Sequence, residues 1–83
     1  MAIDVKSAVI KAAEYFKSLF VDVSNIQLEE VELSEDGRWW FVTFSFSRPS
    51  TALGIVFPQK EFKTVELNAE DGQPRAIRIR KND

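Results

Sequence analysis

The sequence predicts an α+β fold in which one N-terminal helix packs across a four-stranded antiparallel meander sheet. Three observations lead to this prediction. Apolar residues recur at three- and four-residue steps over residues 4–20. Residues 38–48 hold both tryptophans and three of the seven phenylalanines, in a pattern typical of a strand. Two Asp-Gly pairs separate segments of alternating polarity. A chain of 83 residues builds one small two-layer domain, so residues 1–83 are predicted to form a single domain.

Composition excludes several classes of function. The formal net charge of −2 gives no general attraction to nucleic acid, which is an unlikely partner. The chain has no cysteine and no histidine, so thiol chemistry and the commonest general base and metal ligand are missing. Charged residues such as Asp4 and Lys6 interrupt any signal-like or membrane-spanning run near the N-terminus. We therefore expect a cytoplasmic protein without membrane, metal or cofactor, with a processed secreted form as the alternative.

The first element is expected to be a helix from about Asp4 to Phe20. Asp4 is a suitable N-cap residue. The alanines of this helix suggest that it closely approaches a flat sheet. The apolar stripe consists of Val5, Ala8, Val9, Ala12, Phe16, Leu19 and Phe20.

The first strand is expected from Ile26 to Glu35 and needs an irregularity. Its apolar residues change from even to odd positions, so a β-bulge near Glu29 and Glu30 is predicted. Asp36 and Gly37 then form a two-residue turn of type I′, which places Leu33 opposite Trp40.

The aromatic segment is expected to be the central strand, and this register assigns its two faces. Trp40 should be buried against the helix near Ala12 or Phe16. The inward set is Trp40, Val42, Phe44 and Phe46, and the outward set is Trp39, Phe41, Thr43, Ser45 and Ser47.

The rest of the chain is expected to complete the meander. Residues 49–58 are interpreted as a connection, with residues 54–57 as a short edge strand in the alternative. The third strand runs from Gln59 to Ala69 and the fourth from about Pro74 to Lys81, joined by a three-residue loop with Gly72 in the left-handed conformation. Inward residues are then Val65, Leu67, Ala69, Ile77 and Ile79, while Arg78 and Arg80 face outward beside Glu66.

Nearly the whole chain resembles a PepSY-type domain, in the cystatin-like α+β superfamily. The similar segments are residues 28–33 (Leu-Glu-Glu-Val-Glu-Leu), residues 37–43 (Gly-Arg-Trp-Trp-Phe-Val-Thr), residues 62–72 and residues 76–79. Asn68 and Asp71 depart from the family pattern, which often has aspartate and threonine there. The resemblance implies an α+β domain and, as function, peptidase inhibition or regulation.

Two surfaces are candidate sites. One is the outward face of the sheet, where Trp39 and Phe41 share a side with Arg78 and Arg80. The other is the apolar segment with Leu53, Ile55 and Phe57, which could dock into a partner. The competing interpretation is that this segment folds back as a lid over the core, or that it or the arginine stems cover the two aromatics.

The carboxylates of residues 29–36 are a weaker candidate. Glu30 and Glu32 share one face of a strand, as in a metal or acid–base pair, but acidic residues on an edge strand also discourage aggregation.

We therefore predict a non-catalytic binding or regulatory domain that contacts a protein partner or forms a weak homodimer. The alternative is a small-ligand-binding protein or hydrolase of cystatin-like fold, with a pocket between helix and sheet.

Overall fold

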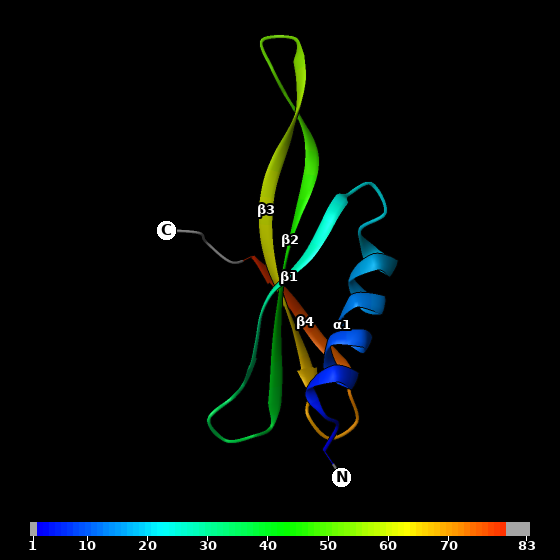
Figure 1. Ribbon diagram of the computed structural model, residues 1–83, viewed down its shortest axis with the longest axis vertical. Helices are drawn as coiled ribbons and strands as arrows, with labels where there is room; N and C mark the ends of the chain where they lie inside the picture. Colours follow the sequence, from blue (N-terminus) through cyan, green and yellow to red (C-terminus); the bar gives the residue numbers. More distant parts are fainter. Residues whose placement is uncertain (1, 80–83) are drawn as a thin grey trace.

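The computed structural model describes residues 2–79 and confirms the predicted architecture. Helix α1 (Val5–Leu19) precedes four strands, β1 (Ser24–Leu33), β2 (Trp39–Ala52), β3 (Ile55–Asn68) and β4 (Pro74–Ile79). The strands form one antiparallel sheet in the order β1-β2-β3-β4. The molecule is elongated, 51 × 26 × 17 Å, because β2 and β3 extend far beyond the other elements (Figure 1).

Helix α1 begins and ends as its sequence predicts. The Asp4 carboxylate accepts a hydrogen bond from the Ser7 N–H at 2.8 Å, and the Phe20 N–H donates to the Phe16 carbonyl at 3.0 Å. Small side chains let the helix lie close to the sheet, and Ala8, Ala12 and Phe16 are fully buried. The end positions of the predicted stripe, Val5 and Leu19, are about half exposed, so the buried stripe is shorter than predicted.

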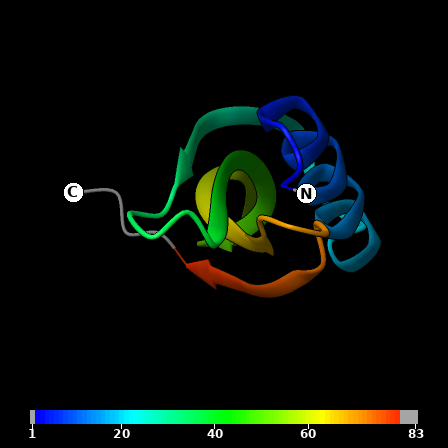
Figure 2. The ribbon, with the colours of Figure 1, turned by 90° about the horizontal axis from the view of Figure 1, so that it is seen from below.

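The core lies between α1 and the middle of β2 and β3 (Figure 2). The Phe16 ring lies 5.5 Å from that of Phe44 and 5.1 Å from that of Phe46. Trp40 packs against this core on the predicted face, and its Nε1 donates to the Ile3 carbonyl at 3.3 Å, but it is only partly buried. The strand residues that are buried in the core are Val42, Phe44, Phe46, Val65 and Leu67.

The register between β1 and β2 confirms the predicted bulge. Leu33 pairs with Trp40, and the register shifts between Leu28 and Glu30. The turn differs from the prediction, because type I′ needs a positive φ at both central residues and only Gly37 of the pair has one. The Ser34 N–H bonds to the Trp39 carbonyl at 2.8 Å, which makes the loop four residues long.

The connection from β3 to β4 contains the predicted left-handed glycine. Gly72 has φ +75, a left-handed conformation that glycine adopts without the strain that a side chain would cause. Ile79 was predicted inward and is instead 76 % exposed. The twist of the sheet carries the end of β4 away from α1 (Figure 2), so nothing in the helix covers Ile79.

The predicted connection at residues 49–58 is wrong, because these residues are strands. Residues 49–58, which we call the arm, form the two-stranded end of the β2–β3 hairpin at the top of Figure 1. Leu53 and Gly54 join the strands with φ values of 53 and 76, as a type I′ turn requires.

Two prolines mark where the four-stranded body narrows to the arm. A two-residue turn closes on the hydrogen-bonded pair Ala52 and Ile55, so by alternation Pro49 and Pro58 form a pair without hydrogen bonds between them. Residues of such a pair direct their backbone groups outward, and a proline there has no N–H to offer a third strand. Pro49 and Pro58 therefore stop further strands from joining the hairpin.

Candidate functional site

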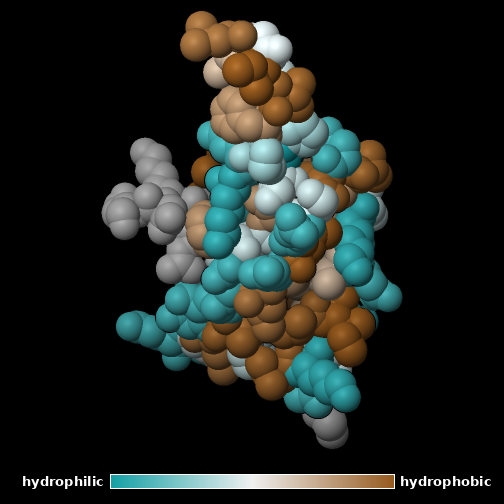
Figure 3. All heavy atoms as spheres, turned by 45° about the horizontal axis from the view of Figure 1, so that its top comes forward, coloured by the Kyte–Doolittle hydropathy of each residue, from teal (hydrophilic) through white to brown (hydrophobic). Residues whose placement is uncertain are grey.

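The arm groups four exposed large apolar side chains on one element. Leu53 at the turn is 100 % exposed, Val56 69 %, Ile55 65 % and Phe57 39 %. Figure 3 shows this hydrophobic group at the tip, separated from a second hydrophobic area low on the body. Leu53, Ile55 and Phe57, which the sequence singled out, are thus presented to solvent on one protruding element.

Alternation places the arm residues on two faces. Phe57 and Ile55 occupy odd positions of β3, as do the core residues Val65 and Leu67, so they continue the face that α1 covers in the body. Val56 and the two prolines lie on the opposite face. The arm is therefore an extension of the core face beyond the end of the helix.

The arm is uncharged, and a largely basic collar surrounds its root. The Arg48 guanidinium lies 5.6 Å from the Phe20 ring centroid and 5.8 Å from that of Phe46, and its Nε lies 3.8 Å from Glu61 Oε2. The Lys60 ammonium lies 5.3 Å from the Phe62 ring, and that of Lys63 lies 5.3 Å from the Phe20 ring. Three cations and one carboxylate thus separate the apolar arm from the body.

The arm does not fold back as the lid that was one of the predicted alternatives. It extends away from the body, whereas Trp39 and Phe41 begin β2 at its other end (Figure 1). Leu53 stands 12 positions after Phe41, which at about 3.3 Å per residue corresponds to roughly 40 Å of strand. The two predicted docking surfaces are therefore separate.

Arg75 covers part of the outward aromatic face. The Arg75 guanidinium lies 3.8 Å from the Trp39 ring centroid, and both Trp39 and Phe41 are partly buried. Further along the outward face, Thr43 and Ser45 are buried. The Thr43 hydroxyl lies 2.9 Å from that of Thr64, and the Ser45 hydroxyl donates to Glu29 Oε2 at 2.6 Å. This face is therefore partly covered by its own chain.

Glu66 is the buried charge of the outward face. Arg75 Nη2 donates to Glu66 Oε1 at 2.7 Å, and Arg78 Nε donates to Glu66 Oε2. Burial opposes ionisation of this carboxyl, but the hydrogen bonds and charges of the two arginines outweigh it and hold the pKa of Glu66 below its ordinary value. Arg78 faces Glu66 as predicted, within its own chain, and Arg80 lies outside the described residues.

Three surface hollows are lined by strand and turn residues. A hollow of about 410 Å³ adjoins Trp39, with Arg38, Asn68 and Glu70 around it. Another of about 200 Å³ lies at the root of the arm, beside Arg48, Pro49 and Phe57.

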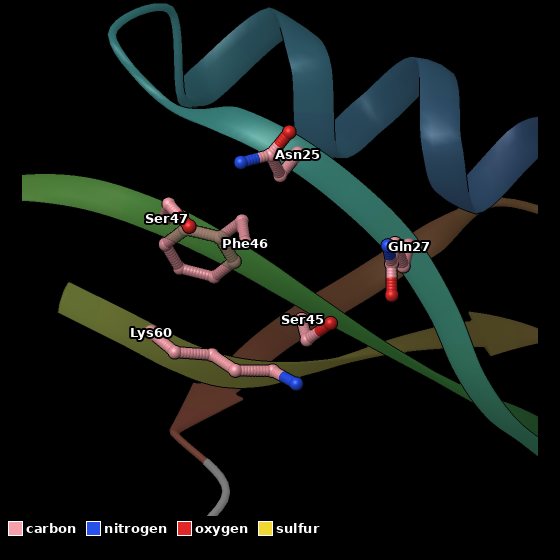
Figure 4. A pocket seen from close by; sticks show the side chains of 6 residues that line it. All are labelled: Asn25, Gln27, Ser45, Phe46, Ser47 and Lys60. Carbon is pink, nitrogen blue, oxygen red and sulfur yellow. The ribbon is translucent and has the colours of Figure 1, made fainter. Parts of the chain in front are cut away.

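The third hollow, of about 210 Å³, opens where β1 diverges from β2 (Figure 4). Two features of β1 at this point were not predicted: the register shift between Ser24 and Gln27 and the left-handed conformation of Asn25. Asn25, Gln27, Ser45, Ser47 and Lys60 place amides, hydroxyls and one ammonium around it.

Over residues 2–79, no group of three or more carboxylates is placed to hold a metal ion. No helix in that range is long and apolar enough to cross a membrane.

Neither a protein-family model, nor a curated protein, nor a solved structure matches this chain. The resemblance to PepSY-type domains therefore stays a prediction.

Sequence reasoning found the apolar residues of the arm but missed the arm itself. One signal was available: Pro49 stands four residues before Leu53, and Pro58 stands four residues after Gly54. This symmetry about a glycine-containing pair is what a hairpin with two blocked edges requires.

Proposed function

We propose that this chain is a non-catalytic binding domain that docks to a protein partner through the arm. The observation that carries the proposal is the exposure of Leu53, Ile55 and Val56 on an element that adds nothing to the core. Monomeric soluble proteins seldom expose grouped large apolar side chains without a binding role.

The arm would bind through its side chains. Strand addition to either edge is restricted, since Pro49 and Pro58 offer no N–H at the first outward-facing position. The apolar tip instead suits insertion into a partner's groove, where burial of the Leu53, Ile55 and Phe57 side chains supplies the binding energy. Peptidase inhibition or regulation would be one use of such a docking arm.

Affinity capture with two matched variants tests the proposal. The arm variant carries Leu53→Ser, Ile55→Ser and Phe57→Ser, and the face variant carries Trp39→Ala and Phe41→Ala. We expect the arm variant to lose the proteins that the immobilised wild type retains, and the face variant to keep them. Loss in the face variant alone would move the site to the outward face and refute the arm as the docking element.

A further inference from the structure

The arm has a complementary surface on the body of the same chain. Strand β1 is an edge strand of the sheet, paired on one side with β2. Residues 24–36 contain five carboxylates and no lysine or arginine. Two of its leucines, Leu28 and Leu33, are about half exposed.

These leucines and carboxylates occupy the two faces of β1. Leu28 pairs with Phe44 and Leu33 with Trp40, so both leucines lie on the helix side of the sheet. Glu30 pairs with Thr43 and Glu32 with Phe41, on the outward side. The open edge of β1 therefore presents apolar surface on one side and acidic surface on the other.

The arm and its collar combine apolar surface with positive charge, which complements the apolar and acidic sides of β1. The tip of the arm is apolar and uncharged, and Arg48, Lys60 and Lys63 at the root outnumber Glu61. If the tip lies on Leu28 and Leu33, the cations of the collar can face the carboxylates of β1. Apolar surface then meets apolar surface, and positive charge meets negative charge.

From this complementarity we propose that the arm of one copy docks on the β1 edge of a second copy, and that the pair is a closed two-fold dimer. This rests on the proposed function and names its partner. A single hairpin tip covers little area compared with a standard interface. Two-fold symmetry uses the same contact twice and leaves no unmatched arm to build filaments.

A lipid surface is the competing occupant for an apolar tip with a basic collar, and the arm's backbone argues against it. Thr51 and Val56 form the next pair without hydrogen bonds between them, so their N–H and carbonyl groups point outward from the two open edges. Unpaired backbone groups are costly in hydrocarbon, whereas groups at a protein surface can bind water or side chains.

Nuclear magnetic resonance with complementary variants tests the arm–β1 contact. One variant carries Leu53→Ser and Ile55→Ser, and the other carries Leu28→Ser and Leu33→Ser. All four side chains are at least about 45 % exposed, so both variants should keep the fold, which circular dichroism and thermal melting would verify. The ¹⁵N-labelled arm variant is titrated with each unlabelled variant in turn.

We expect the β1 amides of the labelled arm variant to shift when the Leu28/Leu33 variant, with its intact arm, is added. They should not shift when the unlabelled arm variant is added. Wild type should show the same β1 shifts on concentration to about 1 mM, and tenfold more salt should weaken them several-fold, since salt screens the collar from the carboxylates.

Three results would overturn the inference. Wild type with no concentration-dependent shifts would exclude self-association. Self-association of wild type without β1 shifts in the mixed sample would point to an arm–arm contact. Arm shifts with phosphatidylserine-containing vesicles but not with protein would assign the arm to lipid. Affinity capture with the arm and face variants decides separately whether the arm binds another protein. The proposed docking function can therefore survive either of the first two results.

Discussion

Glu66 illustrates at the residue scale how a buried charge is stabilised on the outward face. It is 4 % exposed, yet it stays ionised because Arg75 and Arg78 donate to its two oxygens. Arg75 also lies over the Trp39 ring, so one side chain both pairs with the charge and covers part of the aromatic ring. The face that the sequence singled out as a docking surface is thereby partly covered.

The pH dependence of unfolding should report this cluster. The folded-state pKa of Glu66 is depressed, so its contribution is present above the ordinary glutamate pKa of about 4.3 and is lost as pH falls through the folded value. Urea unfolding from pH 7 to 2 should show the free energy of unfolding decreasing below about pH 4. Glu66→Gln should flatten this decrease, and an unchanged profile would contradict the assignment.

Phe16 should contribute more stability than Trp40. Phe16 is fully buried among three other phenylalanine rings, whereas Trp40 is partly buried and bonded to the Ile3 carbonyl. We expect Phe16→Ala to lower the free energy of unfolding by about 3–5 kcal/mol and Trp40→Ala by about 2–3 kcal/mol. Denaturant titration of both variants would check the order, and a larger loss for Trp40→Ala would contradict this picture of the core.

At the element scale, the β2–β3 hairpin is divided by its proline pair into a body part and an arm. Below Pro49 and Pro58, β1 pairs with β2 from Ser47 and β4 pairs with β3 from Lys63, and above the prolines the described chain leaves both edges open. Open edges invite association with other strands, and proline at the outward-facing positions reduces this risk.

Replacing the prolines should therefore promote aggregation. Pro49→Thr with Pro58→Thr restores two outward N–H groups beside an apolar tip, and we expect more thioflavin T signal and turbidity on mild heating. Ser50→Val is a matched control, because Ser50 directs its backbone groups to Phe57 within the hairpin. Equal aggregation of both variants would show that the prolines do not protect the edges.

Much of this element pattern could be predicted from the sequence. Helix α1, the bulge of β1, the inward set of β2 and the left-handed Gly72 follow from periodicity, phase and turn chemistry. The arm could not be identified in this way, because apolar residues between two prolines read equally well as a loop. The exposure of Ile79 was also missed. Alternation along a strand assigns each residue to a face, but it does not show how far the accumulated twist of the sheet carries the strand end from the helix.

At the scale of the whole molecule, the buried core and the arm proposed for docking are different parts. The buried core lies between α1 and the body of the sheet, and the arm contributes none of its members. The longest dimension, 51 Å, includes the arm, which adds no residue to this core. This separation is what a binding domain with a protruding arm requires.

Removing the arm should leave the body folded. Arg48 and Gln59 are a hydrogen-bonded pair by alternation, so Asn-Gly can replace residues 49–58 as a two-residue type I′ turn between them. We expect the shortened chain to keep its circular dichroism spectrum and to change its free energy of unfolding by about 1 kcal/mol or less. A large loss of stability would mean that the arm supports the body and is not a separate docking element.

Photo-cross-linking from the arm in cells tests the docking role most directly. A photoreactive residue would replace Leu53 at the tip and, as a matched control, Val21, which is 86 % exposed in the connection between α1 and β1. We expect discrete protein adducts from position 53, including a band of twice the chain's mass, and none of these from position 21. Equal labelling from both positions, or no protein adduct from position 53, would contradict the docking role.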